Sequence, residues 1–90
     1  KGSDMRAFIL AGLIAGTFLP SAYAQSCGDL WYQRNAIYKD AGYCFNTPRG
    51  IRTFGNAGCR YDNVNDVPLS ANSRARIAEI VRMERGYGCR

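Results

Sequence analysis

The chain has 90 residues, with 12 basic and 7 acidic side chains and a formal net charge of +5. It contains 4 Cys and no His, which disfavours His-dependent acid–base catalysis and thiol nucleophiles that need a His for activation. A chain of this size buries only a small hydrophobic core, so cross-links are expected to stabilise it.

A secretory signal peptide is the first predicted element, over residues 5–24. Residues 1–4 precede the first Met and are interpreted as a cloning remnant or upstream read-through. One basic residue, Arg6, is followed by the apolar run 7–19 and by an A-x-A cleavage motif at 22–24, the pattern of an exported protein. The run has 13 residues, which is too few for a membrane-spanning helix of roughly 20.

The expected mature domain, residues 25–90, is therefore periplasmic or secreted by a bacterium, and it is not expected to insert stably into a membrane. It carries 10 basic and 6 acidic residues, a formal net charge of +4. This mild excess favours contact with anionic envelope material or acidic proteins. Nucleic-acid binding would need a stronger basic patch and does not fit an exported chain.

A helix is predicted near residues 28–41. Ser26 and Asp29 have the spacing of a capping box, which opens helices. Gly42 lies where a left-handed residue ends them. Apolar residues recur at helical spacing along one face and are expected to pack in the core, and Arg34 falls in the middle of this stripe. The stripe consists of Leu30, Trp31, Ile37, Tyr38 and Ala41.

The middle of the mature chain, residues 44–66, is predicted to be irregular. Residues 48–54 have the pattern of one or two helical turns, with Pro48 near the first position. Ile51 and Phe54 would then face inward, since residues three apart share a helix face. A turn is expected directly after this segment, where two Gly flank an Asn-Ala pair.

A second principal helix is predicted near residues 70–85, with Ser70 as its N-cap and Gly86 as its stop. Its apolar residues share a face with Glu84. The sequence therefore predicts a mainly α fold: a small disulfide-stapled domain with two principal helices packed antiparallel and an irregular middle segment.

Two disulfides are expected, because an even number of Cys in a short exported chain indicates a disulfide framework. Cys27 and Cys44 lie at opposite ends of the first helix, roughly 20 Å apart, whereas a bridge needs Cα atoms within about 7 Å. Antiparallel packing of the helices favours Cys27–Cys89 with Cys44–Cys59. The second-ranked pairing joins Cys27 to Cys59.

An ion pair between Arg34 and Glu84 follows from the same packing. If Cys27 and Cys89 are joined, the two charges lie about 10 Å and 8 Å from the bridge, at nearly the same level. A lone buried charge is too costly to persist, so the two are expected to pair, with Asn35 or backbone carbonyls accepting spare donors. The alternative is that both side chains reach water separately.

No catalytic, cofactor or metal site is predicted. The Asx-rich segment 62–66 lacks the Gly of a calcium-binding loop, and Val64 occupies a donor position. The Cys residues form no C-x-x-C pair, which disfavours zinc. A hydrolase would need two suitably spaced carboxylates, but no pair of acidic residues is singled out by its spacing, so the chain is not expected to be an enzyme.

The segment 31–45 resembles the signature of the YARHG domain, a small bacterial module that is presumed extracellular. Its motif has an Arg-Asn pair, an Ile-Tyr pair and an aromatic segment after a Gly. The matching residues are Arg34, Asn35, Ile37, Tyr38, Gly42, Tyr43, Phe45 and, later, Phe54. The predicted helix over 69–84 resembles the family's closing helix, so that the resemblance extends over residues 27–89.

Two departures limit what the resemblance carries over. Lys39, Asp40 and Ala41 precede Gly42, so the His of the family motif is absent. The usual Trp-Tyr pair is replaced by Arg-Tyr at 60–61. The chain is most similar to a four-Cys, stand-alone variant. The resemblance implies an envelope accessory module and no catalytic activity.

We therefore expect an exported, non-catalytic envelope module that binds an anionic polymer or a partner protein. Arg49, Arg52 and Arg60 are the candidate binding surface, because the planar guanidinium suits phosphates and carboxylates. The simpler alternative is that they are solvated surface charges. The alternative function is a proteinaceous inhibitor of an envelope enzyme such as lysozyme, a task that suits a rigid scaffold.

Overall fold

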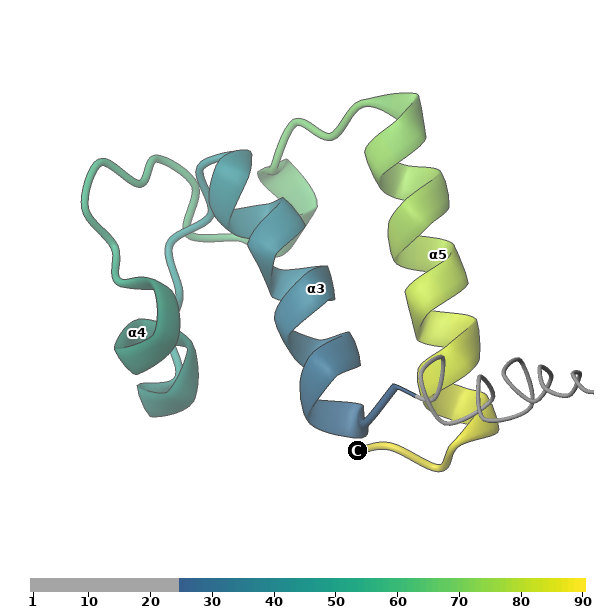
Figure 1. The fold of residues 1–90 in the computed structure, drawn as a ribbon. Helices are drawn as coiled ribbons and strands as arrows, with labels where there is room; N and C mark the ends of the chain where they lie inside the picture. Colours follow the sequence, from purple (N-terminus) through teal and green to yellow (C-terminus); the bar gives the residue numbers. More distant parts are fainter. Residues whose placement is uncertain (1–24) are drawn as a thin grey trace, which may run out of the picture.

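The computed structural model describes residues 25–90, and the predicted signal peptide and the residues before it lie outside the described part (Figure 1). Extended structure in the described residues is limited to one isolated bridge between Tyr43 and Tyr61. The predicted mainly α class is therefore confirmed. None of the helices described is long and apolar enough to cross a membrane. The elements, in chain order, are α3 (Cys27–Asp40), α4 (Pro48–Phe54), the 3₁₀ turn η3 (Val64–Asp66) and α5 (Ala71–Gly86).

Helix α3 begins and ends at the residues that the sequence indicates. The Asp29 backbone N–H donates to the Ser26 hydroxyl at 3.0 Å, and the Ser26 N–H donates to the Asp29 carboxylate at 3.3 Å. At the other end Gly42 adopts a left-handed φ of 98°. The Tyr43 N–H then donates to the Tyr38 carbonyl at 3.0 Å, which completes a Schellman motif. Local hydrogen bonding thus fixes both ends.

Helix α5 lies within one residue of its predicted range, but Gly86 is not the residue that stops it. Gly86 is its last residue and has no positive φ, so it does not stop the helix. The left-handed residue is Gly88, with a φ of 70°. The Cys89 N–H donates to the Glu84 carbonyl at 2.8 Å, the Schellman bond of this end. The prediction that Gly86 stops the helix is wrong because two Gly lie close together here. Only the second, Gly88, turns the chain so that Cys89 meets Cys27.

The short helix α4 packs through Phe54 but not through Ile51. Pro48 takes its first position, as predicted, and Thr47, which the sequence did not single out, caps it. The Phe54 ring stacks on the Phe45 ring at a centroid distance of 5.0 Å. Ile51 is exposed, so its predicted inward orientation is wrong. A seven-residue helix has one buried side. In α4 this side carries Gly50 and Phe54, which pack against Phe45, so Ile51 faces solvent.

The hydrophobic core is small and is formed by helix α3, helix α5 and the two segments around Phe45 and Val67. Helices α3 and α5 lie side by side and run antiparallel (Figure 1). Leu30 of α3 and Ile80 of α5 are fully buried, and Phe45 and Val67 of the connecting segments complete the core. Of the predicted apolar stripe on α3, only Leu30 is fully enclosed, while Trp31 and Tyr38 are half-buried.

Gly50 is a close packing point where an added methyl group would clash. An ideal Cβ there would lie 2.8 Å from Cδ1 of Phe45. Overpacking costs about 1–3 kcal/mol, while Ala favours a helix over Gly by up to about 1 kcal/mol. Gly50→Ala should therefore lower the free energy of unfolding by about 1–2 kcal/mol, measured by urea denaturation. Gly86→Ala is the control, since no atom lies within 4 Å of its added Cβ. An equal effect of both variants would contradict the clash.

Candidate functional site

The two disulfides have the pairing that the sequence favoured. Cys27 is bonded to Cys89 with a Cα–Cα distance of 5.5 Å. Cys44 is bonded to Cys59 with a Cα–Cα distance of 5.1 Å. The first bridge fastens the start of α3 to the residues that follow α5. The second closes the middle segment onto itself, so that α4 and its following loop stay beside α3.

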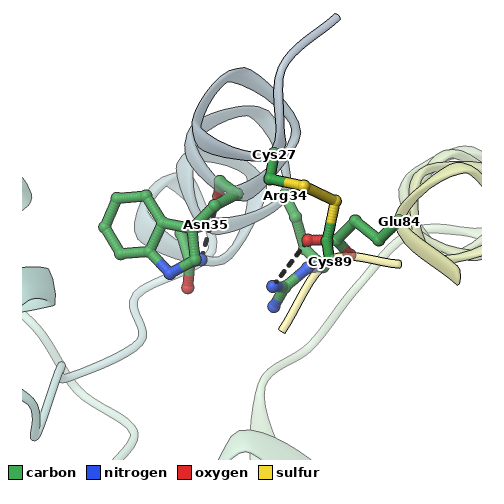
Figure 2. A network of polar contacts seen from close by, with 6 residues as sticks. Cys27, Arg34, Asn35, Glu84 and Cys89 are labelled. Atoms are coloured by element: carbon green, nitrogen blue, oxygen red, sulfur yellow. Dashed lines mark hydrogen bonds and ion pairs between the residues drawn. A yellow bond between two sulfur atoms is a disulfide. The ribbon is translucent and has the colours of Figure 1, made fainter. Parts of the chain in front are cut away.

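The structure brings Arg34 and Glu84 together in a bidentate ion pair, close to the Cys27–Cys89 bridge (Figure 2). Arg34 Nε lies 2.9 Å from Glu84 Oε1 and Nη2 lies 3.0 Å from Oε2. Their side chains are 27% and 13% exposed. The Asn35 amide does not join the pair but donates to the Trp31 carbonyl at 2.9 Å. The pair links α3 to α5, so its role is structural.

Asn56 is a structural residue that the sequence did not single out. The Phe45 N–H donates to its Oδ1 at 2.7 Å, and its Nδ2 donates to the Phe45 carbonyl at 2.9 Å. One side-chain amide thus satisfies both backbone groups of a buried residue, as a neighbouring strand would. The only signal in the sequence was an Asn in a turn, a position that usually serves its own backbone.

The candidate binding surface is built on α3 and α4. The Arg49 guanidinium lies over the Trp31 ring, 3.7 Å from its centroid. The Phe54 ring packs between the two aromatics of α3, with centroids 5.9 Å from Trp31 and 5.0 Å from Tyr32. Tyr32 remains 52% exposed. We call this set, together with Arg52 one turn after Arg49, the aromatic–arginine surface: Trp31, Tyr32, Arg49, Arg52 and Phe54.

The three predicted arginines do not form one cluster on one element. Arg49 and Arg52 share α4, while Arg60 lies in the following loop, with its guanidinium 5.7 Å from the Tyr61 ring centroid. The ion pairs found within residues 25–90 are Arg34–Glu84 and Arg76–Glu79. In that part of the chain Arg49, Arg52 and Arg60 thus have no carboxylate partner.

The aromatic–arginine surface offers aromatic and cationic groups to a ligand. Among residues 25–90 no group of three or more acidic or Cys side chains is placed to hold a metal ion. Both disulfides are formed and no free thiol remains there. A guanidinium held on an indole face combines a planar hydrogen-bond donor with an apolar platform.

A protein-family model described as the YARHG domain matches residues 6–85. This range begins within the segment predicted to be the signal peptide and ends inside α5. Neither the curated proteins nor the solved structures contain a match.

Proposed function

Because the chain belongs to the YARHG domain family, as the match over residues 6–85 establishes, we propose that it is a non-catalytic envelope module that binds an acidic partner protein through its aromatic–arginine surface. The two disulfides and the family are consistent with an extracellular or periplasmic location. What carries the proposal is the Arg49 guanidinium stacked on Trp31.

The stack orders Arg49 before any partner arrives. Ordering a long side chain on binding costs about 0.5–1.5 kcal/mol, and Trp31 reduces this cost by holding the Arg49 guanidinium carbon 3.7 Å from its ring centroid. The guanidinium lies over the ring, and its N–H groups are able to donate to a carboxylate. Arg49 is exposed and, among the described residues, has no acidic partner.

The residues around Arg49 favour a protein partner over a polymer. Trp, Tyr and Arg are the residue types most enriched where binding energy concentrates in protein interfaces. Trp31, Tyr32 and Arg49 place all three types together, and Tyr32 is 52% exposed. A uniformly charged polymer would need cations spread along a track, whereas here two arginines share one short helix with aromatic neighbours.

The binding test uses the oxidised protein immobilised and exposed to envelope extract, followed by affinity measurement with each captured protein. Arg49→Gln should weaken binding of the true partner roughly tenfold or more, because a charge-assisted hydrogen bond and its ordered geometry are lost. Arg82→Gln is the matched control, since Arg82 is exposed on α5 and outside the surface.

Other results would redirect the proposal. Retention on cell-wall sacculi with no protein captured would contradict a protein partner and indicate polymer binding. Equal affinities of the Arg49→Gln and Arg82→Gln variants would exclude the aromatic–arginine surface. A captured envelope hydrolase that loses activity on binding would identify the chain as an inhibitor, the alternative set out above.

A further inference from the structure

A second site lies away from the aromatic–arginine surface and shares no lining residue with it. We propose that the hollow between the end of α3, the 3₁₀ turn η3 and the first half of α5 binds a small amphiphile, with an aliphatic tail in the hollow and a carboxylate on Arg74. Figure 1 shows the segment around η3 bridging the C-terminal end of α3 and the N-terminal end of α5.

The hollow has the size and lining of a small-molecule site. Its volume is about 500 Å³, within the range of about 300–1,000 Å³ that is usual for ligand pockets. Five of its eight lining residues are aliphatic, which suits a hydrocarbon tail. Of its two valines, Val67 is buried and Val64 is exposed. The lining residues are Tyr38, Val64, Asn65, Val67, Leu69, Arg74, Ile77 and Ala78.

The charge of the hollow comes from one arginine. Arg74 lines it and donates one Nη1 hydrogen bond to the Leu69 carbonyl. This bond holds the guanidinium against the chain that enters α5. No carboxylate among residues 25–90 pairs with Arg74, and the first turn of α5 has no acidic residue. The remaining N–H groups suit the two oxygens of a ligand carboxylate.

The charge of Arg74 is unfavourably placed for the dipole of helix α5. It follows directly on the first turn of α5, near the end where the helix dipole is positive and a cation is unfavourable. An anion bound at this end would instead be favoured by both Arg74 and the dipole. The uncompensated charge beside an apolar wall therefore matches a ligand that is apolar at one end and anionic at the other.

A small molecule fits the hollow better than an extended peptide. Peptides bound in extended form usually add to a sheet edge and use its free backbone groups. Within residues 25–90 extended structure amounts to the single Tyr43–Tyr61 bridge, and neither residue lines the hollow. The recognition available here is an apolar wall and one cation, which matches a fatty-acid-like molecule with a short tail.

The test is an NMR titration of the oxidised protein with octanoate, with octanol as the uncharged probe of the same tail. Octanoate should shift the amide signals of Val67, Leu69 and Ile77, and octanol should bind at least tenfold more weakly. Arg74→Gln should reduce octanoate affinity roughly tenfold and leave octanol affinity unchanged. Arg82→Gln, an exposed arginine of the same helix, should change neither.

Three outcomes would overturn the proposal. Equal affinities for octanoate and octanol would show that Arg74 does not contribute. Shifts that map to Trp31 and Phe54, with none around Val67, would place the apolar site elsewhere. Binding of a peptide with an apolar C-terminus at Arg74, without any binding of octanoate, would assign the hollow to a protein tail. The spectrum of each variant without ligand shows whether it is folded.

Discussion

Replacing Cys27 and Cys89 together by Ala is expected to lower the free energy of unfolding by about 4 kcal/mol. The bridge spans a sequence separation of 62, and a cross-link that closes a loop of this length restricts the unfolded chain by about that amount. The folded part described here has 66 residues. At about 0.05–0.15 kcal/mol per residue its total stability is about 3–10 kcal/mol. Loss of this bridge should therefore remove about half of the stability or more.

Urea denaturation of the double variant measures this effect, and the second bridge supplies the comparison. Cys44 and Cys59 are separated by 15 residues, so replacing both by Ala should cost about 3 kcal/mol. The critical result is which of the two double variants loses more free energy of unfolding. A larger loss for the Cys44–Cys59 variant would show that strain or residual structure, and not loop length, determines what each bridge contributes.

Arg34→Met is expected to destabilise the protein by about 2–3 kcal/mol, because Glu84 would be left as a largely enclosed carboxylate without its partner. Breaking a fully buried pair costs about 3–5 kcal/mol. Here Arg34 is still 27% exposed, and solvent screening reduces the value. Glu84→Leu should have a similar effect for the same reason. The double variant should be less destabilised than the sum of the two, since it leaves neither charge unpaired.

A double-mutant cycle isolates the energy of this pair. The chain offers an internal control in Arg76 and Glu79, an exposed pair on α5 with side chains 41% and 53% exposed. The matched cycle of Arg76→Met and Glu79→Leu should give a coupling energy of about 0.5 kcal/mol or less. If the Arg34 and Glu84 losses simply add, the two side chains do not interact in solution, and Arg34 becomes available for another contact.

The features that the sequence predicted correctly are of two kinds. Helix ends follow local capping rules, and the disulfide pairing had few alternatives to choose from. The Ser26–Asp29 box and Gly42 are settled within one turn of chain, where capping rules apply directly. Four Cys allow only three pairings, and helix length removes one. Once the bridge between Cys27 and Cys89 is assumed, the rise per residue brings Arg34 and Glu84 to one level.

The candidate site was predicted only in part, because its contacts join distant residues. Arg49 was chosen for its charge, but its stack on Trp31 brings together the first and second helices of the described part. The hydrogen bonds between Asn56 and Phe45 likewise join residues that are not neighbours in the chain. No local periodicity reports such contacts. The sequence instead grouped Arg49 with Arg60 by proximity in the chain, while the fold gives each its own aromatic neighbour.

The helix pair α3–α5 is fastened far more strongly at one end than at the other. At one end lie the Cys27–Cys89 bridge and the Arg34–Glu84 pair. The opposite end is held by the noncovalent packing of the segment around Val67. Native proteins open in cooperative pieces that begin where packing is weakest. We therefore expect any partial opening of the helix pair to start at the end away from the bridge, which would separate the walls of the hollow beside Arg74.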